Sequence, residues 1–442
     1  MKQKLIICLA LCSNTLGTII SSYNTKRVYE NNNNNNNNKN GRNILNDGLI
    51  LKDRSFEKEI GLPTKDIALQ KRKLAKPKSR QATRSNSTQP YLVVFGDSLS
   101  DNGNQGKPPS PDYWYGRYSN GPVWCEYFAH FNNYTVIDYA YAGATTVGYD
   151  KNGFLALKGS PTLPRQVDMY VEAFSDKYKS GALENDIVAF QAGSNNIVNN
   201  IINIIVGTAD IQELAYDHIS NVTMALKKIN TFGYKKFLVF GIPSIAHTPL
   251  VNSISSYPLG NEIISLLSGK LNAVTDAFNN ALNATVNTYN SKFPDEIDWM
   301  VYVDLYGLTQ TLFTTDVIDN LLFKYPRTGC DIFNLFGKLV SSCVDSNDYG
   351  FMDNIHPSTR IHALLGIVVH KIIENPQFAI SRDSLNELIV EYNLTEVSNT
   401  KNILFNNDTI TTGKINVESY NIQSALDNID KLVADKNKSV RL

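Results

Sequence analysis

Five short apolar runs alternate with longer amphipathic segments between residues 91 and 305. Each run is bounded by Gly, Pro or Asp and is too short for a helix, which predicts buried β-strands. The predicted strands are 91–97, 135–143, 186–193, 235–243 and 298–305, and the predicted helices between them are 163–178, 211–231 and 262–292. A further helix is expected in "SNGPVWCEYFAHF", with Asn120 as its cap. Buried strands separated by helices predict an α/β fold with a parallel sheet covered on both faces.

The two ends of the chain differ from this pattern. Residues 1–22 have a basic start, a short apolar stretch and then small and polar residues, which predicts a secretory signal peptide and an extracellular protein. Residues 23–90 contain an unbroken Asn run at 31–38 and a basic stretch, and we interpret them as a disordered linker, a removable pro-segment or a wall-binding tail. We expect the folded domain at 91–375. Residues 376–442 are expected to be an appendage or a partly disordered tail, although "SLNELIVEYN" and "IQSALDNIDKLVAD" could be helices.

Composition narrows the classes of function. Residues 91–442 carry 25 Lys and Arg against 36 Asp and Glu, and this acidic balance argues against a nucleic acid partner. The chain lacks a second apolar run long enough to span a membrane, so we expect no stable membrane insertion. We also expect the protein to be a monomer.

Cys330 and Cys343 could form a local disulfide, whereas Cys125 is expected to be a buried free thiol. Zinc-type spacing is absent, and seven N-x-S/T sequons fit a secreted glycoprotein.

Chemically active residue types follow the predicted strands. Ser98 follows the first strand, Gly143 the second and Asn195 the third, and Asp353 and His356 lie in "MDNIHPS" before a later helix. Because ligands of parallel α/β sheets bind at the carboxyl ends of the strands, we expect these residues to meet at one edge.

Their roles in such a site would be complementary. Ser98 would be the nucleophile, His356 the general base and acid, and Asp353 the residue that orients the imidazole. The backbone N–H groups of Ser98 and Gly143 and the side-chain amide of Asn195 would form the oxyanion hole. Such a site needs neither a metal nor a cofactor. Taken singly, Asp353 could instead cap the following helix and Asn195 could be a helix N-cap.

With these residues the chain resembles the GDSL, or SGNH, family of esterases and lipases. "FGDSLSDNGN", "YAYAGATT", "GSNN" and "DNIHP" match its conserved blocks over about residues 91–375. The resemblance implies a three-layer α/β/α, flavodoxin-like fold with a parallel sheet of about five strands. Asn196 stands where the family usually has Asp, and we expect it to affect hydrogen bonding in its loop rather than abolish activity. Ser100 replaces the second Gly of "G-x-S-x-G", which counts against an α/β-hydrolase.

"GRYSNGPVWCEYFA" and "FGIPSIAHTP" are similar to the secreted fungal-type branch, which contains acetyl esterases acting on plant-wall carbohydrates. The main hypothesis is therefore a secreted serine esterase that deacetylates plant cell-wall carbohydrates, with a small-molecule or polysaccharide ester as substrate. The alternatives are a lipase or phospholipase of haemolysin type and a catalytically inactive carbohydrate-binding protein. The aromatic residues 111–124 could bind sugar or pack in the core, with Trp114 and Tyr115 expected to be exposed. Arg117 could bind substrate or anchor its own loop, and His130, His218, His247, His362 and His370 are assigned to structure or surface.

Overall fold

The structure is a computed structural model that describes residues 90–105, 113–147, 160–174, 184–251, 261–333, 339–399 and 404. The predicted signal peptide, the linker or pro-segment and the segment "IQSALDNIDKLVAD" lie outside these residues. Residues 82–201 and 210–442 form the main unit, and residues 202–209 belong to a second one. Taken by themselves, residues 202–209 comprise most of α6 (Ile201–Val206) and a closing turn, in which the Thr208 N–H donates to the Asn203 carbonyl.

The main unit is built on a five-stranded parallel sheet. Its strands are β1 (Tyr91–Gly96), β2 (Thr135–Asp138), β3 (Ile187–Gln191), β4 (Lys236–Phe240) and β5 (Trp299–Val303), in the order β2-β1-β3-β4-β5. Each observed strand lies inside one of the predicted ranges, so the predicted α/β fold is confirmed. The strand order is that of flavodoxin. From β1 the chain adds β2 on one side and then β3, β4 and β5 on the other, so the switch point of the sheet lies between β1 and β3.

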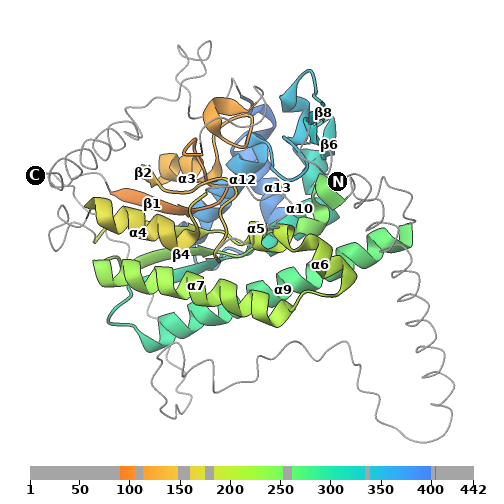
Figure 1. Ribbon diagram of the computed structural model, residues 1–442. Coiled ribbons are helices and arrows are strands. Elements are labelled where there is room, and N and C mark those ends of the chain that lie inside the picture. Colours follow the sequence, from red (N-terminus) through yellow and green to blue (C-terminus); the bar gives the residue numbers. More distant parts are fainter. Residues whose placement is uncertain are drawn as a thin grey trace, which may run out of the picture. The chain divides into compact units, whose positions relative to one another are not determined.

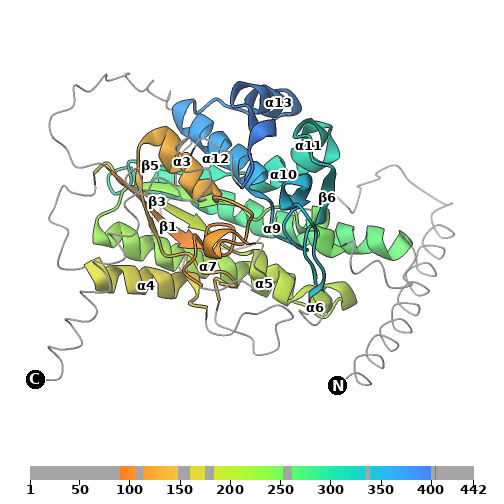
Figure 2. The same ribbon diagram turned by 90° about the horizontal axis from the view of Figure 1, so that it is seen from above.

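Helices cover both faces of the sheet (Figures 1 and 2). One face carries α3 (Trp124–Asn132) and α12 (Thr359–Glu374), and the other carries α4 (Leu163–Phe174), α7 (Ile211–Phe232) and α9 (Asn261–Lys292). The remaining helices are α5 (Ser194–Asn199), α10 (Leu305–Thr314), α11 (Val317–Asn320) and α13 (Arg382–Glu391), with the 3-10 turns η1 (Trp114–Gly116), η2 (Ile245–His247), η3 (Ser346–Asp348) and η4 (Leu394–Glu396). Two small sheets pair β6 (Tyr325–Gly329) with β9 (Tyr349–Phe351) and β7 (Ile332–Phe333) with β8 (Leu339–Ser341).

The two faces of β1 explain why its sequence is apolar without interruption. Leu92 and Val94 join the core formed with α3 and α12. On the opposite face, the ring of Phe95 meets that of Tyr170 on α4 edge-on, with the ring centroids 5.6 Å apart. Because side chains alternate across a strand, a sheet buried on both faces needs apolar residues at every position.

The start of α3 corrects one prediction. The helix begins at Trp124 and not near Asn120, because the Glu126 carboxylate accepts a hydrogen bond from the N–H of the N-cap residue Val123 at 2.9 Å. Asn120 serves a different helix: its side-chain oxygen accepts from the N–H of Thr359, at the start of α12. A contact between residues so far apart in the chain leaves no local signal in the sequence.

Residues beyond 375 contribute to the main core. Leu385 and Leu388 of α13 are buried in the same hydrophobic cluster as α3 and α12, and Leu394 and Val397 follow them. The compact domain therefore continues past the expected boundary at residue 375. This extension consists of α13, which contacts α10, α11 and α12, and of η4, which contacts α12 and α13.

The cysteines behave as the sequence predicted. Cys330 and Cys343 form a disulfide, and Cys125 is a buried free thiol on α3. In the described part of the chain, none of the helices has both the length and the apolar character needed to cross a membrane.

Candidate active site

The turn after β1 places Ser98 on the wall of a pocket. A side chain at Gly96 would clash with the Gln191 carbonyl, since a Cβ there would lie only 2.4 Å from that oxygen. The amide of Gln166 bonds both the N–H and the carbonyl of Gly96, at 2.9 and 2.8 Å. Asp97 then accepts the N–H of residue 99, which closes the turn around Ser98. The nucleophile candidate is thus held by a close packing of β1 against β3.

The structure brings Ser98, His356 and Asp353 together. The Nε2 atom of His356 lies 2.7 Å from the Ser98 hydroxyl oxygen, across 258 positions of sequence. On the other side of the ring, Nδ1 lies 2.6 Å from Oδ2 of Asp353. The Oδ1 atom of Asp353 accepts the backbone N–H groups of Ile355 and His356 at 2.7 and 2.8 Å. Asp353 does not cap α12, whose N-cap residue is Ser358, so that alternative is wrong.

The charges around Ser98, His356 and Asp353, called the relay below, determine which of their atoms carry protons. Burial raises the pKa of Asp353, but the charge and hydrogen bond of His356, together with a hydrogen bond from Tyr113, outweigh it and hold the pKa below its ordinary value. An ionised carboxylate only accepts hydrogen bonds, so His356 donates from Nδ1 and turns the lone pair of Nε2 toward Ser98. Nearby, burial raises the pKa of Asp97 to about 6.

The three proposed oxyanion donors line the same pocket. Gly143 lies in a turn with a positive φ of 79°, which favours glycine and allows the backbone to approach closely. Asn195 lies in the first turn of α5, whose N-cap residue is Gly193, so the reading of Asn195 as an N-cap is wrong. One hydrogen of the Asn195 amide bonds the Ala144 carbonyl at 2.9 Å, and within the described ranges the second has no acceptor. Among the described residues, no carbonyl accepts the backbone N–H of Ser98 or Gly143.

Two polar side chains hold the loop that carries Gly143. Asp101, from the turn after β1, accepts the Ala142 N–H at 2.7 Å. Asn196 accepts the Thr146 N–H at 3.0 Å and donates to the hydroxyl of the same residue at 2.9 Å. The expectation that Asn196 takes part in loop hydrogen bonding is therefore met. Asp101 was not singled out, although it lies within the motif "FGDSLSDNGN".

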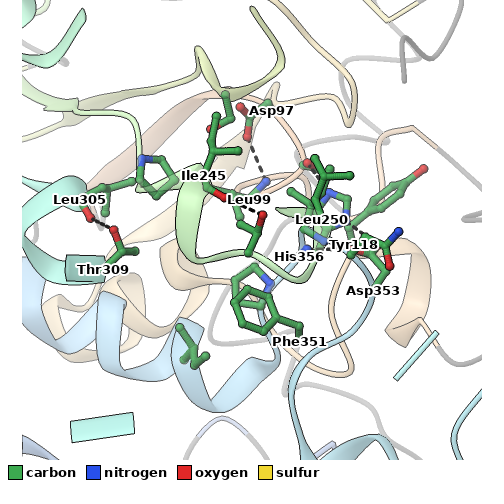
Figure 3. Close-up of a pocket in the computed structure, with 18 of the residues that line it drawn as sticks. Asp97, Leu99, Tyr118, Ile245, Leu250, Leu305, Thr309, Phe351, Asp353 and His356 are labelled. Carbon is green, nitrogen blue, oxygen red and sulfur yellow. Dashed lines mark hydrogen bonds and ion pairs between the residues drawn. The ribbon is translucent and has the colours of Figure 1, made fainter. Parts of the chain in front are cut away.

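The catalytic groups line a largely apolar cavity of about 410 Å³. In Figure 3, Asp353, His356 and Tyr118 lie on one side of it and Leu305 and Thr309 of α10 on the other. The apolar side chains that line it include Ile245, Leu250, Leu308, Leu312, Phe313, Phe351, Ile361 and Leu364. The sequence offered no distinct signal for this cavity, because lining residues and core residues are both apolar.

The aromatic loop before α3 differs in part from its prediction. Tyr115 is exposed as expected, whereas Trp114 is buried, with 9% of its surface accessible. Arg117 covers the Trp114 ring and forms a bidentate ion pair with Glu126, at 2.5 and 2.9 Å. Arg117 therefore anchors its own loop, and the ion pair places Trp114 inside.

Sequence reasoning missed Tyr113. Its hydroxyl donates to Oδ2 of Asp353 at 2.5 Å, so it touches the relay directly. The only signal was its position in an aromatic-rich stretch. Of the other histidines, His218 and His362 are buried, and burial lowers the pKa of both to about 3. His362 lines the same pocket as Ser98 and His356, so its assignment to structure or surface stays a prediction. In the described ranges, His, Cys, Asp and Glu form no group that could hold a metal ion.

The model of the GDSL-like lipase/acylhydrolase family matches residues 92–368. A GDSL esterase/lipase of Arabidopsis thaliana is 26% identical over 319 residues, covering 62% of this chain and 85% of that protein. The phosphatidylcholine-sterol acyltransferase of Aeromonas hydrophila is 25% identical over 326 residues, covering 67% and 93%. The thermolabile hemolysin of Vibrio parahaemolyticus is 29% identical over 308 residues, covering 64% of this chain and 63% of that protein.

A solved family two carbohydrate esterase from Clostridium thermocellum is more distant, with 11% identity and a TM-score of 0.35. That match covers 67% of this chain and just under two thirds, 66%, of that chain. The match to the family model spans the nucleophile turn, the loops of Gly143 and Asn195 and the segment with His356. The chain therefore belongs to the GDSL-like lipase/acylhydrolase family of carboxylic ester hydrolases.

Proposed function

We propose that this enzyme hydrolyses esters of long apolar acyl chains through an acyl-enzyme on Ser98. The observation that carries the proposal is the joining of two features in one pocket. The hydroxyl of Ser98 is bonded to His356 at 2.7 Å, and both residues line one largely apolar pocket of about 410 Å³. Cavities of this size hold molecules much larger than an acetyl group.

The geometry supports the following reaction. His356 takes the proton of Ser98 through Nε2 as the oxygen attacks the ester carbonyl. The backbone N–H groups of Ser98 and Gly143 and the free amide hydrogen of Asn195 stabilise the oxyanion. The imidazolium then gives its proton to the leaving alcohol, which leaves an acyl-serine. Water attacks this ester, again with His356 as base, and the carboxylic acid leaves as the Ser98 proton returns.

The cavity favours the lipase alternative over deacetylation of carbohydrates. An acetyl group has one methyl beyond its carbonyl and would leave the space between α10 and α12 empty. Each methylene that enters such an apolar space gains about 0.8 kcal/mol, or about fourfold in affinity. The Aeromonas relative is named for phosphatidylcholine and a sterol, and we extend the lipid class of that substrate to this chain.

Asn196 is the only sequence feature that favours a catalytically inactive carbohydrate-binding protein. Because Asn196 bonds Thr146 rather than Ser98 or His356, its identity leaves the relay intact.

A series of aryl esters tests the proposal. Turnover of acetate, butyrate, octanoate and laurate esters of one alcohol is compared with that of acetylated xylan and a phospholipid. We expect kcat/KM to rise by up to about fourfold per methylene until the cavity is full. Ser98→Ala should lose both turnover and labelling by a fluorophosphonate. A maximum on acetate, with release of acetate from xylan, would favour the carbohydrate esterase, and failure of the folded wild type to label would exclude a Ser98 acyl-enzyme.

We also propose that the enzyme is exported. The disulfide between Cys330 and Cys343 supports this, because such bonds persist in oxidising compartments. The sequon residues Asn133, Asn283 and Asn393 are exposed and accessible to glycosylation. N-terminal sequencing and deglycosylation of protein from the growth medium test the proposal. Full-length, unglycosylated protein retained in the cytosol would contradict it.

A further inference from the structure

The catalytic carboxylate of Asp353 has a fourth hydrogen-bond donor, which comes from a distant loop. Its Oδ1 atom accepts two backbone N–H groups. Its Oδ2 atom accepts both Nδ1 of His356, at 2.6 Å, and the hydroxyl of Tyr113, at 2.5 Å. Tyr113 and Asp353 are 240 positions apart in sequence. The oxygen that faces the catalytic imidazole is therefore shared between two donors.

Tyr113 is held firmly in this position. It is buried, with 5% of its surface accessible, and its ring packs against that of Tyr118 at 5.4 Å between centroids. The Tyr118 ring in turn packs against the imidazole of His356 at 4.9 Å. The next residue, Trp114, donates its N–H to the Ser119 carbonyl at 2.8 Å, which closes the loop. Loop and imidazole thus form one packed unit.

We propose that Tyr113 is a positioning residue whose hydroxyl fixes the Asp353 carboxylate and takes part of the negative charge of the oxygen facing His356. This inference rests on the proposed use of Ser98 and His356. A charge-assisted hydrogen bond neutralises part of the charge on its acceptor. With less charge on Oδ2, the carboxylate stabilises the imidazolium less, so the imidazolium gives its proton more readily to the leaving alcohol.

Tyr113 can act as a donor at every working pH. Burial and the charge of Asp353 raise the pKa of its phenol above the ordinary value, so the hydroxyl keeps its proton. The buried Asp331 adds to this effect from the segment that follows β6.

The other groups around His356 do not change when Tyr113 is replaced. They are Asp353 on its own loop, Asp97 after β1, Tyr118 from the aromatic loop and His362 on α12. We expect each to keep its position in a variant that lacks only the Tyr113 hydroxyl, in which Asp353 loses that one donor. A shift in the titration of His356 in that variant is therefore attributable to the lost bond.

The test compares Tyr113→Phe with the wild-type enzyme over pH, using the aryl ester that the wild type turns over best. We expect the acid limb of kcat/KM to move to higher pH by about half a unit, because the carboxylate regains charge and His356 protonates earlier. The plateau should fall by about tenfold, the equivalent of one net hydrogen bond.

Tyr170→Phe is the matched control. Its hydroxyl is also buried and bonds the hydroxyl of Tyr234, under the opposite face of the sheet. This variant should lose thermal stability to a similar degree without any shift of the acid limb. A merely structural Tyr113 would behave in the same way as this control.

A second variant gives a shift of opposite sign. Incorporation of 3-fluorotyrosine at position 113 makes the phenol a stronger donor, so the acid limb should move to lower pH. The inference would be overturned if folded Tyr113→Phe had its acid limb at the wild-type pH. If Tyr113→Phe does not fold, the same result for the fluorinated enzyme would overturn it. Failure of the proposed Ser98 acyl-enzyme is a separate result, because the folded wild type itself would then not label with a fluorophosphonate.

Discussion

Replacing Leu308 with Trp tests whether the acyl chain of the substrate enters the cavity behind Ser98. Leu308 lies on α10, is 4% exposed and lines the cavity opposite the catalytic groups. The larger indole would occupy space that the distal part of a long chain needs. We expect the methyl of an acetate ester to stop beside Ser98 without reaching this wall, so short substrates should be spared.

The magnitude follows from the methylenes that are excluded. If the indole excludes about four methylenes, the loss is about 3 kcal/mol at about 0.8 kcal/mol each, or about 200-fold in kcat/KM. Overpacking adds a stability cost of about 1–3 kcal/mol, which thermal unfolding would register without affecting specificity. The informative quantity is therefore the ratio of kcat/KM for laurate and acetate esters of the same alcohol.

Leu322→Trp is the control, since Leu322 is 70% exposed and lies outside the cavity lining. It should leave the laurate-to-acetate ratio unchanged. An equal loss on both esters in Leu308→Trp would mean that the variant disturbs the catalytic groups. An unchanged ratio with a folded protein would mean that the acyl chain binds elsewhere, and the reasoning from the cavity would be refuted.

Two further predictions concern the oxyanion hole and the buried histidines. Asn195→Ala removes a proposed oxyanion donor and should lower kcat by about 10²–10³-fold with little change in KM. The kcat of Asn196→Asp should stay within about tenfold of the wild-type value. If stopped assays show equal, small effects for both variants, Asn195 is not part of the oxyanion hole. Burial lowers the native pKa of His218 to about 3, below the unfolded value of about 6.5, so stability present above pH 6.5 is lost as the pH falls toward 3. In His218→Gln, the free energy of unfolding measured in urea should fall less steeply as the pH decreases, by up to about 1.4 kcal/mol per pH unit. A pH dependence identical to that of the wild type would contradict this assignment.

The candidate site could be predicted from the sequence because its residues follow strands. Ser98, Gly143 and Asn195 come after three apolar runs, which were predicted to be buried parallel strands and are such strands in the structure. Since parallel strands share one edge at their carboxyl ends, the sequence order alone implied that these residues would be neighbours. His356 follows no strand of the main sheet, yet it was expected at the same edge as the base that Ser98 needs, and its Nε2 atom lies 2.7 Å from the Ser98 hydroxyl oxygen.

Predictions that used only local pattern were less reliable where distant contacts decide. Asn120 looks like a helix cap, yet it bonds Thr359 at the start of α12. Trp114 looks like an exposed sugar platform, yet Arg117 and Glu126 hold it inside. In each case the partner that determines the outcome is set by the tertiary arrangement of loops and helices.

The sequence by itself determined the sheet, the order of its catalytic blocks and the chemistry of the residues in them, because burial period and strand ends are local properties of a chain. Only the tertiary structure decided which acyl group fits and which donor completes the relay. In the sequence Leu308 cannot be told from a core residue, and only the tertiary arrangement of α10 and α12 forms the cavity that both helices line. The bond from Tyr113 to Asp353 likewise exists only because folding brings together two loops that have no relation along the chain.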